Sequence, residues 1–326
     1  MRRLLALVSV ATACASLQAQ TIGPGFAGSY TASSLGSVPG LPPRYGGLTF
    51  LDANTLLIGG SANTAAGSLY TIGVTRGADG SITGFSGTAQ LFGGPSGTVG
   101  EYNDGGVAFG PGGVLFTARW PINGLGQTKP GSIDEDKIID LDPLGVQSSL
   151  SAINFVPAGF GGEGRIKLVT YGGGAFYSAS LTPDGNGTYD LAGLVQVDVD
   201  PDEPGTQTLP GGPEGFVYIT AGNPGFATNS MLLSEYRAGL VAAYSLDADG
   251  NPLLGTRRVF VDGLSGAEGA AIDPVTGDFL FSTFGGGDQV LRVSGFAAPI
   301  PEPSTWLLMA LGLAGLASRA GARRPG

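Results

Sequence analysis

The stretch Asp104-Gly105-Gly106-Val107-Ala108-Phe109-Gly110-Pro111 returns, with changes, late in the chain as Glu268-Gly269-Ala270-Ala271-Ile272-Asp273-Pro274. In both copies an acid and a glycine precede a short apolar run, and a turn with proline and glycine leads into a second apolar run. This order is typical of two antiparallel strands joined by a tight turn. Related copies place their glycine at Gly46, Gly164 and Gly215, which gives successive steps of 59, 59, 51 and 54 residues.

The repeat length and the glycine content decide the fold class. Glycine makes up 59 of 326 residues and separates short apolar and β-branched runs, without a collagen-like period. A repeat of 40 to 60 residues that holds about four short strands is the signature of a β-propeller blade. Five copies are visible, and residues 175–210 could hold strands of another. The sequence therefore predicts an all-β fold, a β-propeller of five or six blades, with a β-sandwich as the alternative.

The copies also resemble the loose E-G-x-A-x-D-P-x-x-G pattern of propellers related to the gluconolactonase and NHL-repeat families. The resemblance extends over the whole body of the chain. It implies a propeller and, as an alternative function, a metal-dependent lactonase-like hydrolase with its site in the propeller channel. In that alternative, Asn103 and Asn223 would join acidic side chains around a metal that activates water.

Acidic residues at the heads of the repeats are the candidate metal ligands. The first strand of a blade lines the channel, so these four side chains should ring one mouth: Asp104, Glu163, Glu214 and Glu268. Converging carboxylates repel one another unless a cation or a proton neutralises them. Ca²⁺, which takes six to eight oxygen ligands, is the cofactor that this pattern suggests. The alternative is structural, with each acid accepting hydrogen bonds from the neighbouring blade.

Aromatic residues offer a second candidate feature. Five of them could form a face on which sugar rings stack, or could simply pack in the core: Tyr102, Trp120, Tyr171, Tyr177 and Tyr218. No other constellation predicts catalysis, and we assign no catalytic residue from the sequence.

The N-terminus reads as a secretory signal peptide over residues 1–19. Arg2 and Arg3 precede a short apolar core, and Ala19 ends a plausible cleavage site. Cleavage there removes Cys14, the only cysteine, and the chain has no histidine. A thiol nucleophile, a Ser-His-Asp triad and a His or Cys zinc site are therefore excluded from the delivered protein.

The charge of the delivered part excludes nucleic acid as a partner. Residues 20–297 carry 11 of the 16 Lys and Arg and 25 of the 26 Asp and Glu, a net charge of −14. Phosphate contacts need a basic surface, which this part lacks. A divalent cation or a cationic matrix component is the partner that such a charge favours.

The C-terminal tail, residues 298–326, has three parts in order. Pro301, Glu302 and Pro303 form an extended triplet because proline does not fit inside a helix. Residues 305–318 are uncharged and form a predicted helix slightly short for a membrane span. A basic end follows, with the stop signal at Arg319, Arg323 and Arg324.

This tail resembles a PEP-CTERM sorting domain. The resemblance implies cleavage near the triplet by an exosortase-type enzyme, a transient stay in the inner membrane, and delivery to the cell surface or the extracellular space. The chain thus divides into a signal peptide (1–19), a lead-in rich in Gly, Pro and Ser (20–43), a propeller-like body (44–297) and the tail (298–326). We interpret it as a surface or matrix protein whose body is a non-catalytic module that binds or supports exopolysaccharide.

Overall fold

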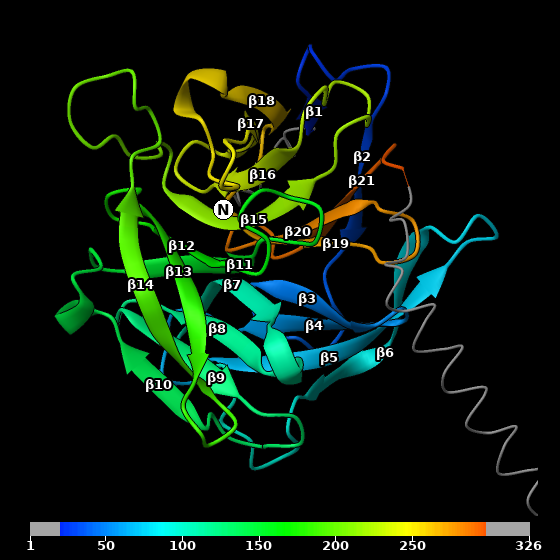
Figure 1. The fold of residues 1–326 in the computed structure, drawn as a ribbon. Helices are drawn as coiled ribbons and strands as arrows, with labels where there is room; N and C mark the ends of the chain where they lie inside the picture. Colours follow the sequence, from blue (N-terminus) through cyan, green and yellow to red (C-terminus); the bar gives the residue numbers. More distant parts are fainter. Residues whose placement is uncertain (1–19, 298–326) are drawn as a thin grey trace, which may run out of the picture.

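Residues 20–297 are described by a computed structural model in which five antiparallel sheets surround a central axis (Figure 1). This arrangement confirms the all-β propeller and sets the number of blades at five. No helix among these residues is long and apolar enough to cross a membrane. The helix predicted at 305–318 lies outside the described residues, as do the signal peptide and the rest of the tail.

Four blades have four strands and one has five. In each blade the strands run from the axis to the rim in the order of the chain, except that β1 and β2, from the N-terminus, are added at the rims of two blades. Blade 1 contains β3 (Leu48–Asp52), β4 (Thr55–Gly60), β5 (Ser68–Arg76) and β6 (Ile82–Leu91). Blade 2 contains β7 (Asn103–Phe109), β8 (Leu115–Arg119), β9 (Gly124–Thr128) and β10 (Lys137–Asp140). Blade 3 contains β11 (Leu150–Phe155), β12 (Ile166–Thr170), β13 (Phe176–Pro183) and β14 (Tyr189–Val197).

Blade 4 contains β15 (Pro213–Ile219), β16 (Ser230–Glu235), β17 (Leu240–Ser245) and β18 (Arg258–Asp262), and β1 (Thr21–Ile22) is added at its rim. Blade 5 contains β19 (Ala267–Ile272), β20 (Phe279–Thr283), β21 (Val290–Ser294) and β2 (Thr31–Gly36). Short 3-10 turns lie at Pro111–Gly113, Asp142–Leu144 and Leu254–Thr256.

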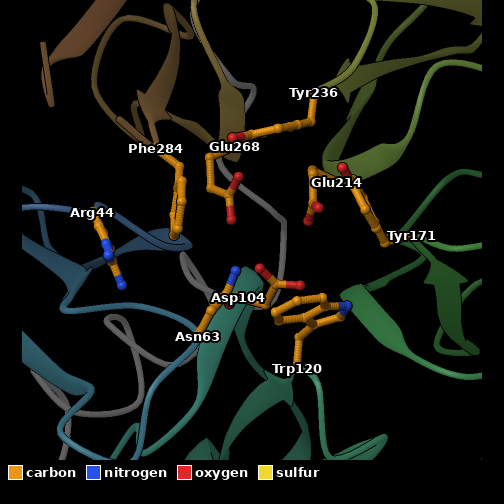
Figure 2. A pocket seen from close by; sticks show the side chains of 9 residues that line it. All are labelled: Arg44, Asn63, Asp104, Trp120, Tyr171, Glu214, Tyr236, Glu268 and Phe284. Atoms are coloured by element: carbon orange, nitrogen blue, oxygen red, sulfur yellow. The ribbon is translucent and has the colours of Figure 1, made fainter. Parts of the chain in front are cut away.

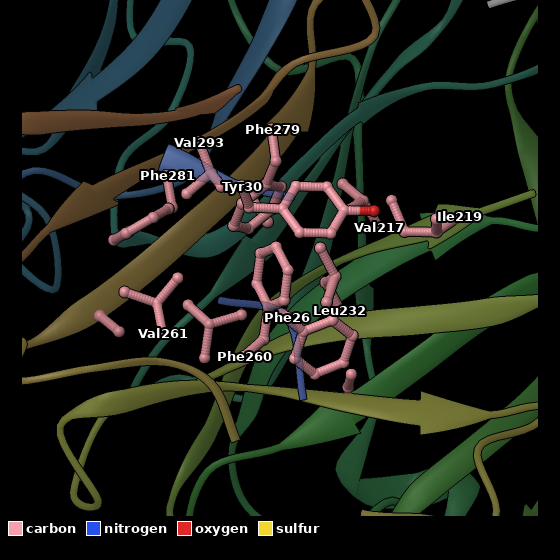
Figure 3. Packing of buried hydrophobic residues seen from close by; sticks show 14 of the residues in the cluster. Phe26, Tyr30, Val217, Ile219, Leu232, Phe260, Val261, Phe279, Phe281 and Val293 are labelled. Atoms are coloured by element: carbon pink, nitrogen blue, oxygen red, sulfur yellow. The ribbon is translucent and has the colours of Figure 1, made fainter. Parts of the chain in front are cut away.

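The N-terminal segment closes the ring. Strand β2 pairs antiparallel with β21, and Thr31 lies opposite Ser294. Phe26 and Tyr30, which come just before β2, pack between blades 4 and 5 against Phe260 at ring-centroid distances of 5.0 and 5.3 Å (Figure 3). Residues 20–43 therefore belong to the packed propeller, and residues 20–297 form a complete ring.

The repeated glycines are explained by the crowding of the innermost strands. A Cβ atom on Gly215 would lie 2.6 Å from the main-chain nitrogen of Ala270, and one on Gly269 would lie 2.6 Å from Cα of Gly47. Such distances are far shorter than van der Waals contact. The glycine after the acid therefore lets the inner strands of blades 1, 4 and 5 meet near the axis.

The third copy of the repeat, at Glu163 and Gly164, is not part of an innermost strand, so the prediction from the sequence was wrong here. Glu163 and Gly164 lie in the turn between β11 and β12, and Gly164 has a φ of 76°, which a turn glycine adopts easily. The innermost strand of blade 3 is β11, which contains no glycine. Residues 175–210 contain β13 and β14 of blade 3 and form no sixth blade.

Candidate functional site

Three carboxylates from three blades meet at one mouth of the channel (Figure 2). Asp104, Glu214 and Glu268 occupy equivalent positions in blades 2, 4 and 5. In each of these blades, the acid comes directly after the residue of the innermost strand that pairs with the last residue of the second strand. Each offers an oxygen within 4.8 Å of the others. Their exposed fractions are only 1%, 3% and 1%, so the cluster forms a buried floor.

The fourth predicted ligand, Glu163, lies elsewhere. It is exposed on its turn, and its Oε2 accepts a hydrogen bond of 3.0 Å from the main-chain N–H of Gly159. The equivalent place in blade 3 belongs to Ser151, whose hydroxyl donates to the carbonyl of Pro213 at 2.7 Å. Three of the four predicted acids therefore share one site.

The three carboxylates have few contacts that would stabilise their charged forms. Four of their oxygens have no hydrogen-bond partner among the described residues: both of Asp104, Oε2 of Glu214 and Oε1 of Glu268. None of the ion pairs formed within residues 20–297 includes any of the three acids. Buried carboxylates without donors are costly in the charged form. The site therefore needs either bound protons or a cation.

Burial raises the pKa values of all three acids, and repulsion from neighbouring carboxylates adds to the rise for Glu214 and Glu268. Burial raises the pKa of Asp104 to about 7. Burial, followed by the charge of Asp104, raises the pKa of Glu214 well above its usual range. Burial, followed by the charge of Glu214, does the same for the pKa of Glu268. A divalent cation would reverse these shifts by stabilising the charged forms.

Four aromatic side chains build the wall above the floor (Figure 2). Each comes directly after the second strand of its blade: Trp120, Tyr171, Tyr236 and Phe284. Neighbouring rings meet edge to face at centroid distances of 6.3, 5.9 and 6.0 Å, so the wall is continuous across blades 2 to 5. It encloses a cavity of about 370 Å³.

Blade 1 interrupts this wall. Ser61 follows β4 where the other blades have an aromatic residue, and Arg44 and Asn63 line the cavity here. The carboxamide of Asn63 reaches toward Asp104 (Figure 2), and its oxygen has no hydrogen-bond partner among the described residues. The amide nitrogen is the atom that faces the acids (Figure 2), so the carboxamide would have to turn over to offer its oxygen to a cation.

Of the aromatic residues considered from the sequence, only Trp120 and Tyr171 line this cavity. Tyr177 and Tyr218 are 3% and 9% exposed and pack in the core. Tyr236 and Phe284 were missed. The sequence pattern that could have identified them is an aromatic residue directly after the polar residue that ends the second strand of blades 2 to 5, as in Arg119-Trp120 and Thr283-Phe284.

A second cavity, of about 740 Å³, opens at the other end of the inner strands. Asn223 lines it and accepts a hydrogen bond of 2.8 Å from the main-chain N–H of Ala297. Asn103 lies next to Asp104, but its side chain donates to the carbonyl of Gly100 at 2.7 Å. Asn223 is thus remote from the acidic floor.

Without divalent cations, the propeller should lose stability as pH rises from 5.5 to 8. Unfolded carboxyls have pKa values near 4. A raised folded-state pKa means that the native state holds more protons, so stability falls as pH rises through about 7. Asp104 alone should account for roughly 2 kcal/mol over this range. Urea unfolding in EDTA measures the change, and equal stability at the two pH values would contradict this expectation.

The molecule is thus a five-bladed propeller with an acidic, aromatic-walled mouth. Residues 299–324 match the PEP-CTERM protein-sorting motif. The chain therefore carries the signal of exosortase-processed proteins, which are exported, associate transiently with the membrane and reach the cell surface or the extracellular space. The chain matches none of the curated proteins with which it was compared.

Solved structures resemble the propeller only in outline. The PQQ-bound aldose sugar dehydrogenase of Streptomyces coelicolor is 12% identical, with 83% of this chain and 99% of that chain covered and a TM-score of 0.40. Glutaminyl cyclase of Myxococcus xanthus is 13% identical, with 81% and 96% covered and a TM-score of 0.46. Similarity at this level does not indicate a shared activity.

Proposed function

We propose that this exported protein is a non-catalytic binding protein that holds Ca²⁺ on Asp104, Glu214 and Glu268 and binds a segment of extracellular polysaccharide above it. The observation that carries the proposal is the buried carboxylate cluster, with its unpartnered oxygens, at the floor of an aromatic-walled cavity. A cation explains why three acids are buried together in the absence of a basic partner.

The donor set suits Ca²⁺ in kind and number. Calcium takes six to eight oxygens from carboxylates, amide carbonyls and water. Three carboxylates supply between three and six, and the amide oxygen of Asn63 supplies one more if the carboxamide turns over. The remaining positions face the cavity, where hydroxyl groups of a ligand would complete the shell.

The aromatic wall favours a saccharide as that ligand. Sugar rings present C–H faces that pack on aromatic rings, while their hydroxyls coordinate cations. Trp120, Tyr171, Tyr236 and Phe284 offer such surfaces on four sides of the cavity. A mostly apolar pocket with a few convergent polar groups is the usual form of a small-ligand site.

The last described residues lie away from the acidic mouth. The described chain ends at Ala297, which lies at the opposite mouth.

Trp120 gives a direct test. It is the only tryptophan in residues 20–297, because the other, Trp306, belongs to the tail. We expect at least one of a panel of short neutral and acidic oligosaccharides to change its fluorescence in Ca²⁺ and not in EDTA. If the whole panel leaves Trp120 emission unchanged in Ca²⁺, saccharide binding at this cavity is refuted.

A metal-dependent hydrolase of the lactonase type is the second candidate. The same carboxylates could hold a cation that activates water, and their raised pKa values suit proton transfer at neutral pH. Hydrolysis of lactones or phosphotriesters by residues 20–297 with Ca²⁺, Mn²⁺ or Zn²⁺, lost on replacing Glu268 by glutamine, would establish it. Turnover that persists in that variant would assign the activity to a contaminant.

A further inference from the structure

Two arginines at the candidate site are unlike the other basic residues of the propeller. Of the 11 Lys and Arg in residues 20–297, six form ion pairs. Arg165, Lys167 and Arg258 make side-chain hydrogen bonds instead. Within the described part of the chain, only Arg44 and Arg237 have neither.

Arg44 lies at the gap in the aromatic wall, and its backbone is held in place. Its φ is 65°, a left-handed conformation that is uncommon outside glycine. Its main-chain N–H donates to Oδ1 of Asp288 at 3.0 Å, and its carbonyl accepts from the N–H of Ala62, also at 3.0 Å. The backbone thus fixes the point from which the guanidinium extends into the cavity (Figure 2).

Arg237 lies on the opposite side, behind the wall. Its guanidinium stacks on the ring of Tyr171 at 4.3 Å from the centroid, an arrangement that orients both groups. It is close enough to Glu214 for its charge to offset part of the rise in the pKa of that acid. The guanidinium of Arg44 therefore lines the cavity, and that of Arg237 lies behind its wall, against Tyr171.

A bound cation would offset most of the negative charge of the three acids, so that an anionic group could approach them. Three carboxylates and one divalent cation sum to −1, and Arg44, the basic residue that lines the cavity, brings the sum to zero. Arg237 behind the wall and Asp288 beside the Arg44 main chain have opposite charges and leave this sum unchanged. Both arginines are exposed, so their charges are available to a ligand. One carboxylate on the ligand would add an oxygen to the shell of the cation and give Arg44 a partner.

We infer that the ligand is an acidic saccharide of the uronic acid type, whose carboxylate lies between the bound cation and Arg44 while its ring packs on the aromatic wall. This inference rests on the proposed function and adds the class of saccharide. Arg237 contributes through the field that it adds and through its stacking on Tyr171.

The test uses residues 20–297 and follows binding by Trp120 fluorescence. The two ligands differ only at their carboxyl groups, which are charged in one and esterified in the other. Trigalacturonate and its methyl ester share rings and hydroxyls, and the ester lacks the carboxylates. In Ca²⁺ we expect the ester to bind about tenfold or more weakly, with Arg44→Gln weakening trigalacturonate binding by a similar factor and leaving ester binding unchanged. Arg258→Gln is the matched control, because Arg258 is likewise an exposed arginine, but it lies in β18 against the ring of Phe26, away from the cavity.

The outcomes separate the inference from the proposed function. Equal binding of the acid and the ester, or full affinity in Arg44→Gln, overturns the acidic ligand and leaves a calcium-dependent saccharide site. Binding of sulfate or phosphate alone, with no saccharide effect, overturns both. A calcium-induced rise in melting temperature in Arg44→Gln equal to that of the wild type shows that the variant is folded and that the cation site is intact.

Discussion

Replacing Glu268 by glutamine should raise the melting temperature of the propeller in EDTA at pH 8 and should abolish its stabilisation by Ca²⁺. The amide keeps the shape of the side chain and removes one of three buried like charges. Without a cation, that removal should stabilise the fold by about 1–2 kcal/mol. Few substitutions of a buried polar group are expected to stabilise a protein, so the sign of the change is diagnostic.

The wild type should behave in the opposite way when calcium is added. Binding to the native state alone contributes about 2.7 kcal/mol at a hundredfold excess over Kd. For a propeller of this size that corresponds to a rise of roughly 5 °C. Differential scanning calorimetry with and without Ca²⁺ measures both changes.

Glu163→Gln is the matched control for this experiment. Glu163 was predicted from the sequence to belong to the same ring of acids, but it is exposed on the turn before β12. Its substitution should leave the calcium response unchanged. A full calcium response in Glu268→Gln, or its loss in Glu163→Gln, would place the cation elsewhere.

Replacing Gly215 by alanine should destabilise the propeller by about 3 kcal/mol or more. The added methyl group would meet main-chain atoms of the next blade, among them the nitrogen of Ala270 at 2.6 Å and the carbonyl oxygen of Glu268 at 2.7 Å. Main chain cannot turn aside as a long side chain can, so the inner strands must separate. Overpacking of this kind usually costs 1–3 kcal/mol, and more where the backbone must move.

The same change should also weaken calcium binding, because Gly215 lies between Glu214 and the strand that carries Glu268. Gly84→Ala provides the control: Gly84 is also a strand glycine, in β6, and a Cβ there would meet only Oγ1 of Thr75 at 3.5 Å. Urea unfolding at pH 5.5 compares the two. Equal stability of both variants would show that the inner strands are not crowded as described.

Local patterns in the sequence were enough to predict the propeller and most of its acidic floor. The acid and glycine before an apolar run mark true inner strands at Asp104, Glu214 and Glu268, because crowding at the axis demands glycine there. The prediction was wrong for the third copy because the hairpin turn between β11 and β12 also contains an acid followed by a glycine. Gly164 serves the turn, whereas β11 carries Ser151 and Ala152 where an acid and a glycine were expected.

The wall and the arginines depend on long-range contacts that no local pattern contains. Trp120 and Phe284 are more than 160 residues apart, and they share a cavity only because the ring closes through β2 and β21. The lack of an ion pair at Arg44 and Arg237 is likewise a property of the assembled surface. The number of blades depended on assigning residues 175–210 to blade 3, which the pairing of β13 with both β12 and β14 settles.

Isothermal titration of residues 20–297 with Ca²⁺ at pH 8 tests the central claim most directly. The cluster of Asp104, Glu214 and Glu268 predicts one calcium ion per chain, with binding that weakens at pH 5.5 because protons then compete for the same oxygens. Binding of one ion that disappears in Glu268→Gln is the expected result. An absence of heat together with an unchanged melting temperature at millimolar Ca²⁺ would contradict the claim and leave three acids that share protons.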